Sequence, residues 1–189
     1  MRDFVREPIV ETAVIHAPIE RVFALSTRVE LVKKTLGMNL VNSGLAEGVA
    51  AGHVRAGSRV HWRGWKFCLP TEHHTLITRF EAPHTHFIRV DHHEITKDAY
   101  FQDSQEEGRF AFFQHDHYFE ESVALETGVT VTTLRDEVHF ALPFGTLGRM
   151  AAAVLLAPHI RRLVQVRYGI LRKLAEGDGW KDWIDAATS

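Results

Sequence analysis

Hydrophobic side chains repeat with two different periods along this 189-residue chain, and the period changes near residue 143. Before that point, five stretches are rich in Phe, Val, Thr and Trp and are separated by turns with Pro, Gly and acidic residues. They are residues 60–69, 75–81, 87–91, 109–121 and 129–142. After it, apolar residues recur about every 3.6 positions as far as Leu174. The pattern predicts an antiparallel sheet of which five or six strands precede one long closing helix.

The first 60 residues add a strand and two short helices. Residues 9–15 are β-branched and partly alternating, and Pro18 suits the first turn of a helix. Ile19, Val22 and Phe23 then share a helix face, and a second amphipathic stretch at 30–36 ends at Gly37, a suitable helix C-cap. Glycines at residues 42–58 indicate a loop or hairpin.

The closing helix is expected to form one wall of a cavity, because a curved sheet needs an apolar cover. Its apolar stripe includes Met150 and Leu163. Replacement of either by alanine should cost about 2–5 kcal/mol if the side chain is buried. Pro158 should kink or split the helix, and Gly177 should end it.

Composition argues against several classes of protein. The 22 Lys and Arg residues nearly balance the 24 Asp and Glu residues, so no charge pattern points to nucleic acid. Cys68 is the one cysteine, which excludes an intrachain disulfide and fits a reducing compartment. The N-terminus lacks a signal-peptide apolar region, and the apolar run at 150–157 is too short to span a bilayer. We therefore predict one cytoplasmic domain, residues 1–189, without an integral membrane segment.

Several motifs resemble those of bacterial proteins of the SRPBCC superfamily, which are START-like, polyketide cyclase/dehydrase-like and coenzyme Q-binding-like. The motifs are Ala-Pro-Ile-Glu-Arg-Val-Phe at 17–23, Gly-Arg-Phe at 108–110, His-Asp-His-Tyr-Phe at 115–119, Asp-Glu-Val at 136–138 and Leu-Pro-Phe-Gly-Thr-Leu-Gly at 142–148. Arg109 stands where these proteins usually have proline, and the segment 83–104 is longer and more polar. That segment is either a lid or an extended hairpin, and we favour the hairpin.

The resemblance implies an α+β helix-grip fold, in which a curved antiparallel sheet of six to seven strands wraps around a long C-terminal helix. It also implies a partner: an apolar or aromatic small molecule, lipid-, quinone- or polyketide-like, bound in an internal cavity. An aromatase/cyclase-type enzyme is the alternative, and whether the chain is catalytic stays open. An interaction module with a filled core is a third reading, and a homodimer is compatible with all three.

Strand alternation selects candidate site residues, because successive side chains point to opposite faces. In residues 129–142 the even positions are the more apolar and should face the cavity, which places Asp136 among hydrophobic residues. In residues 109–121 both faces carry aromatic residues, and the resemblance favours the face with His115 and His117. Asp136, His115 and His117 are the candidate catalytic or anchoring groups. A structural hydrogen-bond network is the competing interpretation.

The predicted ligand-binding set combines these three residues with neighbouring apolar ones. It comprises Trp62, Phe113, His115, His117, Phe119, Asp136, Val138, Phe140 and Met150. Trp62 is chosen over Trp65, which lies on the opposite face of the same strand. Ligand identity is beyond the sequence.

No cofactor and no metal are expected. The spacing of His115 and His117, repeated by His84 and His86, matches two metal ligands on one strand face, but Asp136 is the one candidate for a third ligand. If Asp136 lies beside a histidine, its charge should raise the pKa of that histidine, and the histidine should lower the pKa of Asp136.

Overall fold

A computed structural model describes residues 8–42, 48–66, 69–90 and 93–184. They form one seven-stranded antiparallel sheet with the strand order β1-β7-β6-β5-β4-β3-β2. The strands are β1 (Ile9–Ile15), β2 (Asn39–Val41), β3 (Arg59–Lys66), β4 (Leu69–Val90), β5 (His93–Glu107), β6 (Phe112–Ala124) and β7 (Thr130–Ala141). Cys68 lies outside the described residues.

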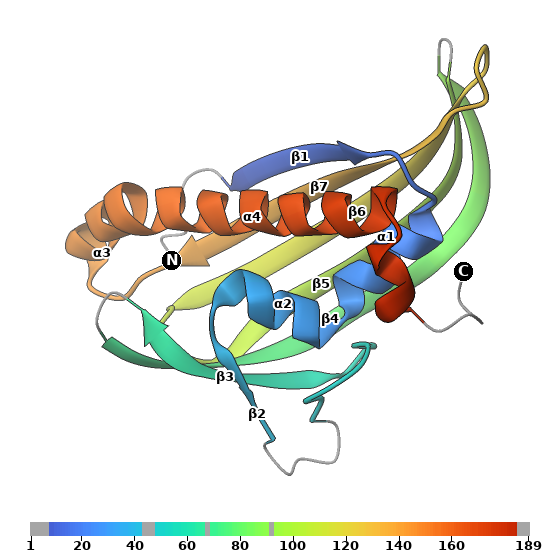
Figure 1. The fold of residues 1–189 in the computed structure, drawn as a ribbon. Coiled ribbons are helices and arrows are strands. Elements are labelled where there is room, and N and C mark those ends of the chain that lie inside the picture. The colour runs from blue at the N-terminus through green and yellow to red at the C-terminus, as the bar shows by residue number, and fades with distance from the viewer. Residues whose placement is uncertain (1–7, 43–47, 67–68, 91–92, 185–189) are drawn as a thin grey trace.

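The helices lie inside the curl of this sheet (Figure 1). They are α1 (Ile19–Thr27), α2 (Val29–Leu36), α3 (Gly145–Ala151), a π-helical turn (Ala152–Leu156), α4 (Ala157–Glu176) and a 3-10 turn (Gly179–Asp182). α4 runs along the sheet in front of β7 and β6, and α1 and α2 lie in front of β5 and β4. The predicted order of a strand, two small helices, a meander and a closing helix is confirmed.

The start of α1 and the end of α2 lie where the sequence predicts. Pro18 precedes α1, whose first backbone N–H, on Ile19, donates to the buried carboxylate of Glu121 on β6 at 3.0 Å. A negative charge at a helix N-terminus is favourable, so Glu121 also fixes α1 against the sheet. Gly37 ends α2 in the left-handed conformation, with φ of 60°.

The sheet differs from prediction mainly in β4 and β5. The stretch 75–81 and residues 87–90 of the next predicted stretch belong to one long strand, β4, whose pairing with β5 is interrupted by register shifts. The segment 83–104 is an extended hairpin, as favoured, with His84 Nε2 paired to Asp98 Oδ1 across it at 3.0 Å. Both faces of a hairpin that extends past the core can meet water, so its side chains need not alternate between polar and apolar. The sequence pattern therefore did not predict a continuous strand there.

The closing helix is interrupted, but the interruption comes before Pro158. Residues 152–156 form a π-helical turn, and Pro158 follows directly as the second residue of α4. A π turn holds more residues than an α turn. Apolar positions that are counted at a period of 3.6 across it therefore fall on different faces of the helix before and after the turn. α4 ends at Glu176, before Gly177, as predicted.

Two groups of buried apolar residues make up the core. The larger joins α1, α4 and strands β1 and β5 to β7, and Phe23 packs edge-on against Phe80, Phe101 and Phe119 in its centre. The smaller surrounds Trp62 on β3 and includes Met38 and Val54. α1 and α2 connect the two groups, and the candidate site lies between them.

Candidate functional site

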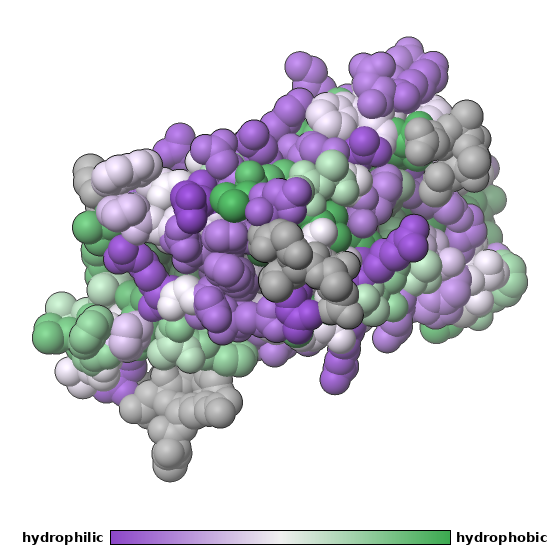
Figure 2. Space-filling view, turned by 90° about the horizontal axis from the view of Figure 1, so that it is seen from below, coloured by the Kyte–Doolittle hydropathy of each residue, from purple (hydrophilic) through white to green (hydrophobic). Residues whose placement is uncertain are grey.

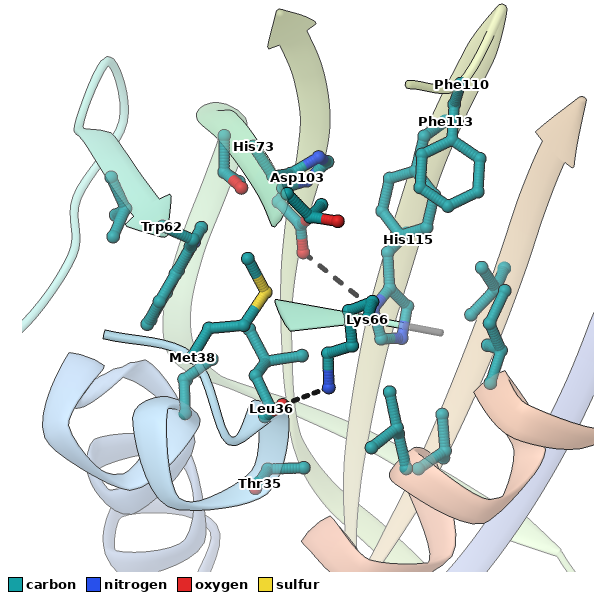
Figure 3. A pocket seen from close by; sticks show the side chains of 18 of the residues that line it. Thr35, Leu36, Met38, Trp62, Lys66, His73, Asp103, Phe110, Phe113 and His115 are labelled. Atoms are coloured by element: carbon teal, nitrogen blue, oxygen red, sulfur yellow. Dashed lines mark hydrogen bonds and ion pairs between the residues drawn. The ribbon is translucent and has the colours of Figure 1, made fainter. Parts of the chain in front are cut away.

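A pocket of about 500 Å³ lies between the two core groups. Trp62 and Met38 line it on one side, and Phe113 and Leu163 line the other. Figure 3 shows Trp62 and Met38 facing Phe110, Phe113 and His115 across the opening. The volume falls within the range of small-molecule sites.

Five of the predicted ligand-binding residues line this pocket: Trp62, Phe113, His115, His117 and Val138. Trp65 is 70% exposed on the other face of β3, which agrees with the choice of Trp62. Asp136, Phe119 and Phe140 are buried behind the wall and do not line the pocket.

The prediction that Met150 lines the cavity is wrong, because 66% of Met150 is exposed on α3. The π-helical turn separates α3 from α4, so the buried stripe of α4 does not continue onto the face that carries Met150. Ala151, Leu155 and Leu156 line the pocket there instead.

The carboxylate of Asp136 contacts both predicted histidines. It is 2% exposed on β7, directly opposite His117 on β6. Its Oδ1 accepts from His115 Nε2 at 3.1 Å and, over a shorter distance, from His117 Nδ1. The predicted arrangement is therefore present, although Asp136 reaches the pocket only through its partners.

Two further charged residues complete the network. Arg167 of α4 donates from Nη1 to both oxygens of Asp136, at 2.9 and 2.8 Å. Asp103 of β5 accepts from His117 Nε2 at 3.0 Å, and its Oδ2 lies 3.9 Å from His115 Nδ1. Figure 3 shows Asp103 and His115 pointing toward each other in the pocket. Five ionisable side chains from four elements thus meet at one wall.

The second terminal nitrogen of Arg167 has a different environment. Arg167 is 8% exposed and lines the pocket, yet its buried Nη2 has no hydrogen-bond partner among the described residues. A buried N–H of a charged group without a partner loses hydration without compensation.

Burial and charge act in opposite directions on these groups. Burial alone would raise the pKa of Asp136, but Arg167 and His117 outweigh it and hold that pKa well below its ordinary value. Burial would also raise the pKa of Asp103, and His117 and His115 lower it overall. Both carboxylates are therefore ionised at neutral pH.

His115 contradicts the expected rise in histidine pKa. Its burial, followed by the charge of His117, lowers the pKa of His115, although Asp136 and Asp103 act in the opposite direction. His115 is therefore uncharged at neutral pH. The sequence reasoning allowed for the carboxylate but not for the desolvation of the imidazole beside a second one.

One end of the pocket lies beneath an apolar surface. Several large apolar side chains at this end of the closing helix are exposed: Phe144, Leu147, Met150, Val154 and Leu155. Leu155 also lines the pocket. In Figure 2 apolar residues gather at the end of the molecule where α3 lies in Figure 1, while much of the remaining face is polar.

Asp103 and Arg167 were missed by the sequence analysis. Asp103 lies on a strand that was predicted as part of a polar hairpin, so its inward face was not identified. Arg167 lies four residues before Leu171 and seven after Ile160, both buried. An arginine at that spacing on an apolar stripe is the signal that would have found it.

Comparison with known proteins supports the architecture. No family model matches the sequence, and no match was found among curated proteins. The protein TTHA0849 from Thermus thermophilus superposes with a TM-score of 0.52 at 14% identity, over 89% of this chain and 99% of that one. A point mutant of Thalictrum norcoclaurine synthase does so with a TM-score of 0.52 at 7% identity, over 92% and 98%.

The chain has the helix-grip fold. The curled seven-stranded sheet, the two helices after the first strand and the closing helix all agree with these structures. A START superfamily protein from Mycobacterium smegmatis also matches, with a TM-score of 0.49 at 13% identity, over 89% of this chain and 99% of that one. The fold predicted from the sequence motifs, a curved antiparallel sheet with a long C-terminal helix, is confirmed by the element order and the sheet topology.

The helix-grip architecture explains why the polar network is buried. β5, β6 and β7 bring Asp103, the two histidines and Asp136 to the inner face, and the closing helix places Arg167 over them. Among the described residues, no helix has both the length and the apolar character needed to cross a membrane.

Proposed function

We propose that this chain binds a small molecule with an apolar or aromatic body and one hydrogen-bond acceptor. The observation that carries this proposal is a mostly apolar pocket of about 500 Å³ whose lining includes His115, His117 and Arg167. Small-molecule sites combine a mostly apolar lining with a few polar groups that orient the ligand. Arg167 is such a group, because Asp136 fixes its guanidinium at the pocket wall.

The lining favours a lipid-, quinone- or polyketide-like body. Trp62, Phe113 and Leu163 offer apolar contact on opposite sides of the pocket, and His115 and Arg167 offer polar contact at one wall. A ketone, phenolate or carboxylate oxygen would suit these polar groups. The exposed apolar surface around Leu155 supports passage of the ligand at that end.

Binding can be tested with 8-anilinonaphthalene-1-sulfonate, which combines an aromatic body with anionic oxygen acceptors. Fluorescence titration should show saturable binding. Leu163→Trp, which fills the pocket, should abolish it, and Val166→Trp on the exposed side of α4 should not. Binding that is equal in the wild type and in Leu163→Trp would contradict the proposal.

The polar anchor needs its own comparison. Arg167→Lys keeps a positive charge beside Asp136 but loses the planar guanidinium at the pocket wall, so affinity should fall about tenfold. Arg161→Lys, at an exposed arginine on the same helix, is the matched control. Native mass spectrometry followed by organic extraction would then identify a co-purifying ligand.

An aromatase/cyclase-type enzyme is the second candidate function. The uncharged His115, hydrogen-bonded to Asp136 at the pocket wall, is placed to act as a general base. Norcoclaurine synthase is by its name an enzyme, so the shared fold does not decide between binding and catalysis. Turnover of a poly-β-ketone substrate, abolished in His115→Gln, would favour the enzyme.

A further inference from the structure

Three groups that commonly bind metal ions converge on one point of the pocket wall. They are Asp103 on β5 and His115 and His117 on β6, whose potential ligand atoms all lie within 4.8 Å of one another. Asp103 Oδ2 lies 3.0 Å from His117 Nε2 and 3.9 Å from His115 Nδ1. Two imidazoles and one carboxylate form the ligand set of many mononuclear metal sites that keep open positions.

A second, independent observation concerns the opposite side of both imidazole rings. Asp136 Oδ1 accepts from His115 Nε2 and from His117 Nδ1, so the other nitrogen of each ring is directed toward Asp103. Arg167 fixes Asp136 in turn through both carboxylate oxygens. Histidines that bind metals usually donate their second N–H to a carboxylate in this way, which sets the tautomer and the ring orientation.

We propose that Asp103, His115 and His117 bind one divalent transition-metal ion, such as Zn²⁺ or Fe²⁺, in the pocket wall. With bonds of about 2.1 Å, two ligands of a tetrahedral site lie about 3.4 Å apart. The distances of 3.0 and 3.9 Å from Asp103 lie on either side of that value. The ion would take the place of the proton between His117 and Asp103. Its remaining coordination positions would face the pocket.

Asp136 has a different role from the one expected of it. The sequence analysis named it as the candidate third ligand beside the two histidines. Its Oδ1 is directed to the ring nitrogens opposite those that face Asp103, and Arg167 occupies both of its oxygens. Asp136 therefore positions the ligands, and Asp103 completes the set.

A similar group on another part of the sheet provides the matched control. His61, Glu72 and His74 also place their potential ligand atoms within 4.8 Å of one another. Glu72, however, is half exposed and accepts from Arg63 Nε at 2.6 Å, so a guanidinium already neutralises its charge. Glu72 also lines the pocket, but Glu72→Gln removes a ligand from this group and leaves Asp103, His115 and His117 unchanged.

Calorimetric titration of the full chain with Zn²⁺ alone tests the site. One ion should bind with the same affinity in the wild type and in Glu72→Gln, and His115→Gln and Asp103→Asn should each weaken it more than about 100-fold, since even an outer carboxylate contributes 10–100-fold. Circular dichroism checks the fold of each variant. Absence of binding, or loss in Glu72→Gln alone, would overturn the proposal.

A measurement on the wild type decides the matter even if a pocket variant fails to fold. One equivalent of paramagnetic Co²⁺ should broaden the imidazole signals of His115 and His117 in NMR spectra before those of His61 and His74. Broadening confined to the latter pair would overturn the site. Neither measurement involves an organic ligand, so the metal site and the proposed small-molecule binding succeed or fail separately.

Discussion

At the scale of single residues, Asp136 is the central member of the buried polar network, because its carboxylate accepts hydrogen bonds from three of the other members. Three of its partners, Arg167, His115 and His117, can carry positive charge, and Asp136 is almost fully buried. Asp136→Asn would leave the Arg167 guanidinium buried beside a neutral amide. We expect unfolding in urea to show a loss of about 3–5 kcal/mol, as for other broken buried ion pairs.

Asp116 offers the matched comparison on the opposite face of β6. It is also buried, but it accepts from the neutral side chains of Tyr100, Gln102 and Gln114. Asp116→Asn should cost about 1–3 kcal/mol, because an amide still accepts some of these bonds. Equal losses in the two variants would show that the charge of Arg167 does not contribute to the stability of Asp136.

Sequence reasoning located three residues of this network and missed two, for physical reasons. Alternation along a single strand is enough to place Asp136 on the inner face, and resemblance added His115 and His117. Asp103 depends on a strand whose far part leaves the core, so its polar composition obscured the alternation. Arg167 lies at helical spacing from Ile160 and Leu171 on the apolar stripe of α4, but only the apolar members of that stripe were considered as core residues.

At the scale of elements, the glycines at the start of the closing helix have distinct functions. Gly145 has a left-handed φ of 56°, and Gly148 lies so close to the Pro143 carbonyl that an added Cβ would come within 2.0 Å of its oxygen. Backbone atoms cannot move aside as a flexible side chain can. The spacing of the motif at 142–148 therefore reflects a tight connection between β7 and α3.

Gly148→Ala should consequently lower stability by about 1–3 kcal/mol, the usual range for overpacking. Gly169 on α4 is exposed, and an added Cβ there meets nothing within 4 Å. Gly169→Ala should instead raise stability by about 0.5–1 kcal/mol through helix propensity. Thermal denaturation of both variants measures the contrast, and changes of the same sign would refute the close approach at Gly148.

The shift of the apolar stripe between α3 and α4 allows a comparison of one buried and one exposed residue. Leu171 on α4 is 2% exposed, whereas Met150 on α3 is exposed. Leu171→Ala should cost about 2–5 kcal/mol, and Met150→Ala less than about 0.5 kcal/mol. Chemical denaturation at one pH is sufficient. A large loss in Met150→Ala would restore the original prediction that this residue is buried.

The elements themselves were largely predictable because most of them pack one face on a core and so show a clear period. β1, both short helices, β7 and the end of α4 follow this rule, whereas β6 carries aromatic residues on both faces. The π-helical turn does not, because its extra residue shifts the pattern without leaving a mark in composition. The outer part of the β4–β5 hairpin also lacks a clear period, because it does not pack one face on a core.

At the scale of the whole molecule, proton binding distinguishes the folded chain from the unfolded one. His73 and His115 have lowered pKa values because of burial, and Asp103 and Asp136 have lowered pKa values through their cationic neighbours, against burial. Below about pH 6.5, the ordinary histidine value, the unfolded chain therefore binds protons that the folded chain does not. Below about pH 4 the carboxylates extend the difference.

Stability should consequently fall as the pH is lowered from about 7, because stability rises with pH wherever the unfolded state binds more protons. The loss begins near pH 6.5, continues through the folded pKa values of the histidines, and steepens below about pH 4. Each tenfold difference in proton affinity is worth about 1.4 kcal/mol. Urea denaturation between pH 8 and pH 4 measures the curve, and His73→Gln should flatten its upper part between pH 6.5 and pH 5. Stability that stays constant from pH 8 to pH 5 would mean that the buried histidines take up protons without unfolding.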